Sequence, residues 1–233
     1  MSMSAGRAVR IMALAALGAS PAWGWTSPPG ADFGREKPSA AAREVADWVV
    51  RSGDHRGTSF ALIDKVQARL YVFDPEGHLQ GASAVLLGLA KGDHTVPGIG
   101  DKPLSAIARH ERTTPAGRFA AEPGRNTAGE DIVWVDYDAA VSMHRVRPVH
   151  AKERRLERLA SATPKDNRIS YGCINVPAAF YDQHVVPALA KRRGVVYILP
   201  ETRPASAVFS MGASGVTADT AKAVAPGKGA RPL

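Results

Sequence analysis

Two patterns of apolar and polar positions follow each other along the chain, with the change near residue 58. Before it, Val45, Trp48 and Val49 recur on one face, which predicts a helix over about residues 40–50. After it, short apolar or alternating runs separated by turn residues predict β-strands. The expected strands cover residues 59–64, 69–74, 78–87, 118–121, 132–135, 141–146 and 195–199.

The segments between these strands carry fewer apolar residues. Residues 88–117 hold many Gly and Pro and are expected to form long loops, which are often functional in a compact domain. A charged helical stretch is predicted over 150–160, a polar loop over 161–168, and a short helix from Pro177 through Tyr181. The pattern as a whole predicts a mainly β fold with a few short helices.

The composition supports an ordered domain of this class. The 233 residues are 45% hydrophobic, enough for a core, and their 22 Gly and 17 Pro suit a turn-rich β domain better than a helical bundle. We predict a single domain at 58–200, preceded by a lead-in with a short helix at 25–57. Residues 201–233 are rich in small and polar residues, and we expect a disordered tail there.

Residues 1–24 have the features of a secretory signal peptide. Arg7 and Arg10 supply positive charge, residues 11–19 are apolar, and residues 22–24, Ala-Trp-Gly, place small residues where a signal peptidase cuts. The apolar run is much shorter than the roughly 20 residues that span a bilayer. The alternatives are a retained anchor and a merely apolar leader. We therefore predict an exported protein of the periplasm or cell envelope, with no integral membrane partner.

The formal net charge of +8 does not distinguish between possible binding partners, because nucleic acid, a membrane surface and a cell-wall polymer are all anionic. The sequence has no basic helix with interleaved aromatic residues and no nucleic-acid motif, so nucleic acid is not an expected partner. No cluster of His, Cys or Asp has the spacing of a metal site, so no metal is expected. The oligomeric state is left open.

Cys173 is the only cysteine of the chain, so no intramolecular disulfide can form. A lone thiol in an oxidising compartment is a liability unless it is buried or used in chemistry. Gly172 before it allows a close backbone approach, and neighbouring N–H groups are candidates to hold an oxyanion. A thiol whose free pKa is about 8.5 needs a base or a positive environment to become a thiolate.

His144 is the first candidate for that base among the seven histidines. It ends an alternating strand on the face opposite Met143, so a rigid strand would hold its imidazole. Its separation from Cys173 is long enough for the chain to return to an adjacent strand. His150, in charged helical sequence, is the second candidate. From residue types alone, a buried structural cysteine and a catalytic pair both remain open.

Three segments, in their order along the chain, resemble one known family. Residues 169–176, Ile-Ser-Tyr-Gly-Cys-Ile-Asn-Val, resemble the signature of the L,D-transpeptidase (YkuD-type) catalytic domain, in which an upstream His accompanies a Ser/Thr-His-Gly-Cys segment. Residues 114–119, Thr-Pro-Ala-Gly-Arg-Phe, resemble the family's Thr-Pro-x-Gly-x-Phe turn, and residues 63–74 its opening hairpin. The resemblance covers about residues 58–200 and implies a β-sandwich or barrel catalytic domain.

The resemblance implies roles for the residues of the signature. Cys173 would be the nucleophile, and His144 the general base and then the general acid. The backbone carbonyl of Arg145 would orient the imidazole. Backbone N–H groups of Gly172 and Cys173 would hold the oxyanion.

The neighbours of this pair are assigned supporting roles, and two of them depart from the family pattern. Ser170 would brace the loop, and Asn175 would bind substrate or satisfy backbone groups. Tyr171, in place of the second His, would donate a hydrogen bond or wall the pocket, and Arg145 stands where Gly usually follows the His. The charged segment 150–168 is an apparent insertion that forms either a lid or a solvated helix.

The implied reaction is acyl transfer at an L,D-amide bond of a peptidoglycan stem peptide, through a thioester and with no metal or organic cofactor. An amine of a second stem or of a protein side chain would resolve the thioester, giving a cross-link or a protein attached to the wall. Two alternatives stay open: an L,D-carboxypeptidase or amide hydrolase on the same scaffold, with water as acceptor, and a non-catalytic wall-binding module.

Overall fold

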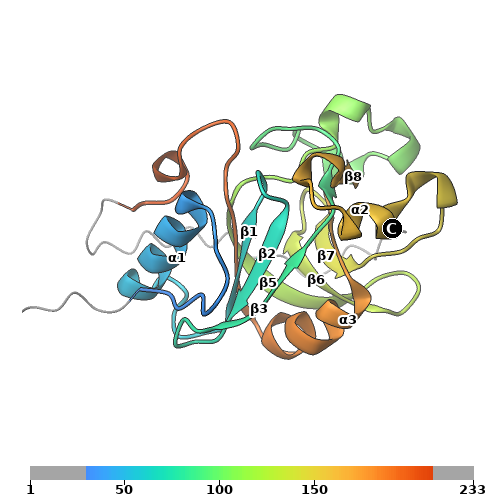
Figure 1. Cartoon of the computed structure of the whole chain (residues 1–233). Helices are drawn as coiled ribbons and strands as arrows, with labels where there is room; N and C mark the ends of the chain where they lie inside the picture. Colours follow the sequence, from blue (N-terminus) through green and yellow to red (C-terminus); the bar gives the residue numbers. More distant parts are fainter. Residues whose placement is uncertain (1–29, 212–233) are drawn as a thin grey trace, which may run out of the picture.

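A computed structural model describes residues 30–211; the expected signal peptide and residues 212–233 lie outside this range. An eight-stranded sheet with the order β3-β2-β1-β10-β5-β6-β7-β9 stands beside a two-stranded sheet of β4 and β8 (Figure 1). The mainly β expectation is confirmed. The strands are β1 (Phe60–Asp64), β2 (Arg69–Phe73), β3 (Leu79–Ala84), β4 (Leu87–Gly88), β5 (Gly117–Arg125), β6 (Asp131–Asp136), β7 (Val141–Arg145), β8 (Arg168–Ser170), β9 (Ile174–Val176) and β10 (Gly194–Ile198).

A single backbone bridge joins the two ends of the large sheet. Just after β3, Leu86 pairs with Asn175 of β9 through two hydrogen bonds, one in each direction and both 2.9 Å long. The sheet therefore nearly closes into a barrel. Because Asn175 lies two residues after Cys173, the closure also fixes the position of the cysteine turn.

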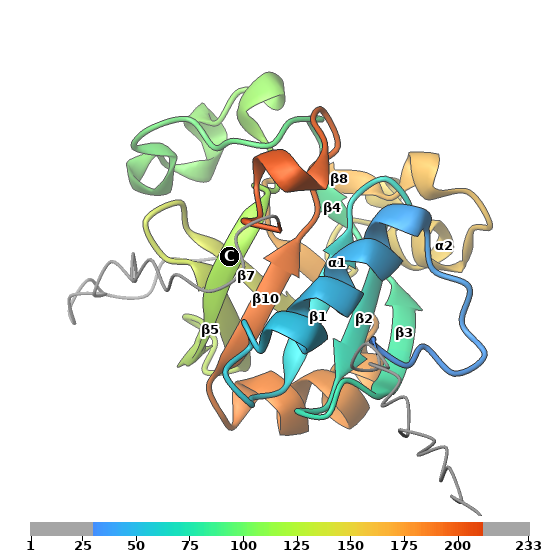
Figure 2. The same ribbon diagram turned by 90° about the vertical axis from the view of Figure 1, so that its left-hand side faces the viewer.

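Two hydrophobic clusters lie on opposite faces of the sheet, because successive side chains of a strand alternate between faces. In β1, Ala61 and Ile63 belong to the interior cluster, whereas Phe60 and Leu62 belong to a second cluster beneath α1 (Ala40–Ser52). Figure 2 shows α1 lying across this part of the sheet. The predicted helix at 40–50 is thus present, and it covers a face that would otherwise expose large apolar side chains.

Residues 201–211 pack against the domain, so the expectation of disorder from residue 201 is wrong for this part. Phe209 is buried, with its ring 6.0 Å from those of Trp48 and Tyr197. The small-residue composition predicted disorder, but Phe209, together with Val208 and Met211, packs against the cluster beneath α1 and holds the segment in place. Glu201 is also buried, in an ion cluster described below.

The strand predicted over 78–87 is two strands, because the chain changes partners within it. β3 pairs with β2 as far as Ala84. Beyond it, Leu86 pairs with Asn175, and β4 pairs with β8. Alternation of side chains predicts that a segment is extended, but it carries no information on which strand lies beside it.

The predicted charged helix over 150–160 is also divided. It consists of η4 (Ala151–Glu153) and α2 (Arg155–Ala160), separated by Arg154, whose φ of 51° interrupts the helical path. The helix predicted from Pro177 through Tyr181 is α3 (Ala178–Phe180), and η6 (Tyr181–Ala190) continues it well beyond its predicted end. The remaining helical segments are the short turns η1 (Ile99–Asp101), η2 (Leu104–Ala106), η3 (Arg109–Glu111), η5 (Pro164–Asp166) and η7 (Ala205–Ala207). Within residues 30–211, no helix has the length and apolar character that a membrane span requires.

Candidate active site

Cys173 lies in the tight turn between β8 and β9 and is 8% exposed. Its Sγ is 3.6 Å from the Oγ of Ser142 and 3.6 Å from the carbonyl O of Ala140. Gly172, directly before it, has a φ of 132°, and a Cβ there would lie 2.9 Å from the carbonyl O of Thr113. The turn that places the thiol against β7 therefore requires glycine.

His144 reaches the same place from β7. Parallel pairing of β7 with β9 sets His144 opposite Asn175, and the alternation along β7 sends Met143 into the interior core instead. The imidazole Nδ1 lies 2.7 Å from the carbonyl O of Arg145, which is the contact that the resemblance implies. Because a carbonyl oxygen only accepts, Nδ1 carries a hydrogen and Nε2 is the nitrogen that can take up a proton.

This arrangement favours the ionised form of the thiol. Burial raises the pKa of the Cys173 thiol, but the hydrogen bond and charge of His144, together with hydrogen bonds from Ser142, outweigh burial and lower the pKa below its ordinary value. A lower pKa gives a larger thiolate fraction near neutral pH, and the thiolate is the nucleophile. The pair is therefore suited to nucleophilic chemistry with a neighbouring base.

Asn175 links the histidine to the inserted segment. It is 1% exposed, and its Nδ2 lies 3.2 Å from Nε2 of His144. Its Oδ1 accepts a hydrogen bond from Nη1 of Arg155, whose Nε in turn donates to the carboxylate of Glu153 at 2.6 Å. The segment 150–168 therefore reaches the site and is more than a solvated helix.

Ser170 braces the cysteine turn through both of its hydrogen-bonding functions. Its Oγ donates to the carbonyl O of Cys173 at 2.6 Å and accepts from the N–H of Gly172 at 3.1 Å. The expectation that the N–H of Gly172 holds an oxyanion does not fit this geometry, because that N–H already has an acceptor. The backbone N–H of Cys173 is the remaining candidate of the two.

The side chains of Tyr171 and Arg145, which stand where the family usually has His and Gly, are engaged with charged neighbours. The guanidinium of Arg112 lies 3.9 Å from the ring centroid of Tyr171. Arg145 forms ion pairs with Asp131 at 3.1 Å and with Asp182 at 2.5 Å. Arg145 thus contacts the imidazole through its carbonyl, while its side chain ties β7 to β6 and to the helix after α3.

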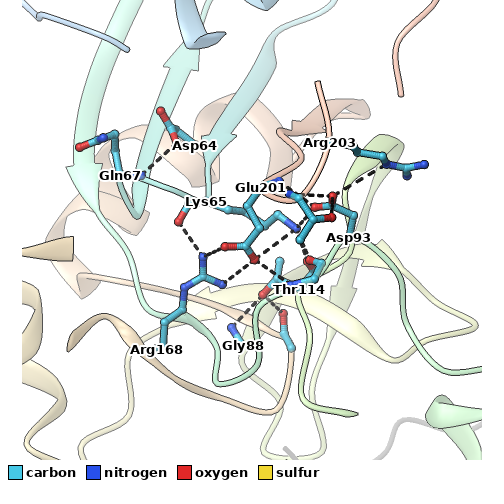
Figure 3. Close-up of polar contacts among 12 residues, drawn as sticks. Asp64, Lys65, Gln67, Gly88, Asp93, Thr114, Arg168, Glu201 and Arg203 are labelled. Atoms are coloured by element: carbon cyan, nitrogen blue, oxygen red, sulfur yellow. Dashed lines mark hydrogen bonds and ion pairs between the residues drawn. The ribbon is translucent and has the colours of Figure 1, made fainter. Parts of the chain in front are cut away.

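Thr114 anchors the cysteine turn, a role that was not predicted from the sequence. It is fully buried; its Oγ1 donates to the carbonyl O of Gly172 at 2.8 Å and accepts from the N–H of Gly88 at 2.8 Å (Figure 3). The available signal was its place at the start of the Thr-Pro-x-Gly-x-Phe segment. That motif marks a turn, but it does not say which backbone atoms the threonine bonds.

Behind Thr114 lies a buried ion cluster of Lys65, Asp93, Arg168 and Glu201 (Figure 3). Lys65 is 1% exposed, and its Nζ donates to Asp93 at 2.9 Å, to the carbonyl O of Thr114 at 3.0 Å and to a second backbone carbonyl at 2.5 Å. Arg168 donates to the two carboxylate oxygens of Glu201 at 3.2 and 2.5 Å. The cluster therefore joins four distant segments and connects them to the cysteine turn through Thr114.

The other candidates of the sequence analysis lie apart from this site. His150, the second candidate base, is exposed at the start of η4. Among residues 30–211, no group of three or more His, Cys, Asp or Glu is placed to hold a metal ion. A cavity of about 410 Å³ lies between residues 37–39, β2 and residues 161–167, but Cys173 does not line it.

Comparisons with known proteins give structural similarity alone, since no family model and no curated protein matches the chain. The chain is similar to the helical cell shape determining protein Pgp2 from Campylobacter jejuni, with 15% identity, TM-score 0.41, and coverage of 67% of this chain and 55% of that one. It is also similar to the LD transpeptidase LdtMt1 in complex with imipenem (17% identity, TM-score 0.37, coverage 61% and 59%). A third similar structure is the L,D-transpeptidase from Xylanimonas cellulosilytica DSM 15894 (15% identity, TM-score 0.36, coverage 60% and 60%).

The chain thus spans 55–60% of the length of these three proteins. TM-scores of 0.36–0.41 are too low to carry an argument about function. The functional interpretation therefore depends on the geometry of the site and on the signature segment.

Proposed function

We propose that this chain is a cysteine-dependent L,D-transpeptidase that acts on peptidoglycan stem peptides in the periplasm or cell envelope. The observation that carries the proposal is the pairing of Cys173 with His144, whose imidazole is oriented by the Arg145 carbonyl and lowers the pKa of the thiol. The substrate class is supported by the signature around Cys173 and by its two companion segments.

In the first half-reaction, Nε2 of His144 takes the proton of the Cys173 thiol, and Sγ attacks the carbonyl carbon of the third stem residue. The N–H of Cys173 stabilises the oxyanion; removal of such a donor typically costs about 3–4 kcal/mol of barrier. The C–N bond then breaks, and His144 returns the proton to the amine of the departing D-alanine. A thioester on Cys173 remains.

In the second half-reaction, an acceptor attacks the thioester carbonyl while His144 takes a proton from it. The C–S bond breaks, and the thiolate regains its proton from His144. An amine acceptor gives a cross-link or an attached protein, whereas water gives a carboxypeptidase product. The two reactions share the acyl-enzyme and differ only in this step.

A non-catalytic wall-binding module is the remaining alternative. Such a module would have no need for an imidazole that lowers the pKa of a buried thiol. Nucleophiles whose pKa is perturbed by a neighbouring base are more typical of active sites than of binding surfaces. The lowered pKa of Cys173 therefore favours an enzyme.

The test is to incubate the purified mature protein with a muropeptide tetrapeptide and identify the products by mass spectrometry. We expect release of D-alanine together with a cross-linked dimer, and loss of both products in Cys173→Ala and His144→Ala. Release of D-alanine without a dimer would assign the carboxypeptidase reaction. Unchanged turnover in Cys173→Ala would contradict the mechanism.

A further inference from the structure

The hydrogen bonds around His144 fix which of its nitrogens carries a hydrogen. Nδ1 faces the carbonyl O of Arg145 at 2.7 Å, and that oxygen can only accept. Nδ1 is therefore the protonated nitrogen of the neutral ring. The single lone pair of the imidazole lies on Nε2.

The orientation of the Asn175 amide is fixed in the same way. A guanidinium has only N–H donors, so the atom of Asn175 that faces Arg155 must be its oxygen. The NH₂ group of the amide therefore points to Nε2 of His144, 3.2 Å away, and donates to it. Arg155 itself is held by Glu153 and is only 13% exposed in its side chain.

Two donors consequently compete for one lone pair. The thiol of Cys173 must give its proton to Nε2 for the reaction to start, yet Nε2 already accepts from Asn175. Once Nε2 is protonated, its N–H would face the NH₂ of Asn175, which is a contact between two donors. A half-turn of the amide would replace that contact with a hydrogen bond to Oδ1, but it would set the NH₂ against the Arg155 guanidinium.

We propose that Arg155 is a latch: it holds the Asn175 amide with its NH₂ on Nε2, and so opposes protonation of Nε2 until the inserted segment 150–168 moves away. This proposal rests on the assignment of Cys173 and His144 as nucleophile and base. Release of Arg155 lets the amide turn, and Oδ1 then stabilises the imidazolium that forms when the thiol ionises. Arg155 is thus a positioning residue that acts through Asn175, and it makes the insertion a regulator of the site.

The effect of the Arg155 charge alone on the thiol is opposite to the effect of the latch, so the two can be distinguished by experiment. A guanidinium near a thiol favours the thiolate, so loss of its charge alone should reduce ionisation. Loss of the latch should instead increase the ionisation of the Cys173 thiol. The charged groups on the elements around the pair are Arg145 with Asp131 and Asp182 beside β7, Arg155 with Glu153 on the inserted segment, and Arg112 over the ring of Tyr171.

The experiment titrates the thiolate of the mature protein by its ultraviolet absorbance, with Cys173→Ala as the blank. Since the chain has one cysteine, the signal belongs to Cys173 alone. We expect Arg155→Met to raise the ratio of thiolate to thiol at neutral pH about three- to tenfold, the factor that one neutral hydrogen bond is worth. Arg158→Met is the matched control, because Arg158 donates only within the insertion, to the carbonyls of Glu153 and Asp166.

A double-mutant cycle separates the latch from a general effect of charge. With Asn175→Ala in the background, Arg155→Met should no longer raise the thiolate ratio. A ratio that is unchanged or lower in Arg155→Met, or raised equally by Arg158→Met or in the Asn175→Ala background, would overturn the latch. If His144→Ala also leaves the ratio unchanged, the proposed function itself fails.

Nitrogen-15 NMR of the unmutated protein gives a second test, in which a variant serves only for assignment. The His144 signals are assigned by their absence in His144→Ala. In the neutral ring we expect hydrogen on Nδ1 and a hydrogen bond accepted by Nε2. A ring with its hydrogen on Nε2 would contradict the latch.

Discussion

The buried ion cluster around Lys65 and the site around Cys173 place polar groups at similar depth, but they are satisfied in different ways. In the cluster, each of the three Nζ donor positions of Lys65 has an acceptor, and Lys65 and Arg168 pair with Asp93 and Glu201. At the site, the Asn175 amide donates to Nε2 of His144, the same lone pair that must take the proton of the thiol, while the thiol itself lies near the carbonyl O of Ala140. The satisfied donors of Lys65 make the cluster a fixed support, whereas two donors that need the same lone pair leave the site able to change state.

The ionisation of the two regions follows the same contrast. Burial raises the pKa of Asp93, but hydrogen bonds from Lys65 and Thr202 outweigh it and hold the pKa well below its ordinary value. Burial lowers the pKa of Lys65 below its ordinary value, although its hydrogen bond to Asp93 and the charges of Asp93 and Glu201 partly oppose that effect. The cluster holds fixed ion pairs, whereas the reaction proposed for the site requires a proton to move from sulfur to nitrogen.

The largest expected effect is the loss of the cluster's charge balance. Asp93→Asn leaves Lys65 buried beside one carboxylate instead of two, and breaking a buried ion pair in this way typically costs about 3–5 kcal/mol. Urea denaturation of the mature protein measures this loss. Glu122→Gln is the control, because it removes the exposed pair with Arg193, 80% exposed in its side chain, and should cost less than about 1 kcal/mol.

The same contribution has a defined pH dependence. Because the pKa of Asp93 is lower in the folded than in the unfolded protein, its stabilising effect is complete above the unfolded value and disappears as the pH falls through the folded value. The difference in stability between the unmutated protein and Asp93→Asn should therefore persist at neutral pH and shrink only in strong acid. A difference that disappears near neutral pH, or an equal loss in Glu122→Gln, would remove the contrast between the two regions.

A smaller effect is expected where the two regions meet, at Thr114. Thr114→Val keeps the shape of the side chain but leaves the N–H of Gly88 and the carbonyl of Gly172 without their partner. Unsatisfied buried groups of this kind cost about 1–3 kcal/mol, and we also expect slower acylation because the cysteine turn loosens. Stopped-flow kinetics alongside denaturation measures both.

Thr114→Ser is the matched variant, because it keeps the hydroxyl and loses only a methyl group. It should keep most of the acylation rate. If Thr114→Val acylates as fast as the unmutated protein, the cluster supports the fold but does not position the nucleophile.

The smallest effect is expected at Ser142, within the site. Its hydrogen bonds help to lower the pKa of Cys173, so Ser142→Ala should raise that pKa and reduce the thiolate fraction at neutral pH. A weak sulfur contact of this kind should change the fraction by about twofold, in thiolate titrations that compare it with His144→Ala. An effect equal to that of His144→Ala would mean that the hydroxyl, and not the imidazole, activates the thiol.

Much of the fold was predictable from the sequence, because it depends on local periodicity. Apolar alternation located seven strand segments and the helix α1, and it placed Met143 and His144 on opposite faces of β7. The glycine before the cysteine also followed from a local requirement, a φ of 132°. The pairing of the strands could not be predicted from this periodicity. The break between β3 and β4, for example, depends on which strands lie beside the chain.

The polar contacts of the site were less predictable, because they join residues far apart in the sequence. Lys65 follows β1 in a turn, where a lysine is normally exposed, and only the arrangement in space shows it to be buried. Arg155 lies in a charged segment that resembles a solvated surface, yet its guanidinium reaches Asn175. The hydrogen bond from the N–H of Gly172 to Ser170 was missed for the same reason, since a motif does not record which donors are already occupied.

The central claim is that Cys173, activated by His144, forms a covalent acyl-enzyme with a stem peptide. Intact-protein mass spectrometry after incubation with a tetrapeptide and rapid acid quenching measures this directly. The expected result is a mass increase of one tripeptide-containing acyl group on the unmutated protein, none on Cys173→Ala, and a strongly reduced fraction on His144→Ala. An adduct that persists in Cys173→Ala, or no adduct on the folded unmutated protein, would contradict the claim.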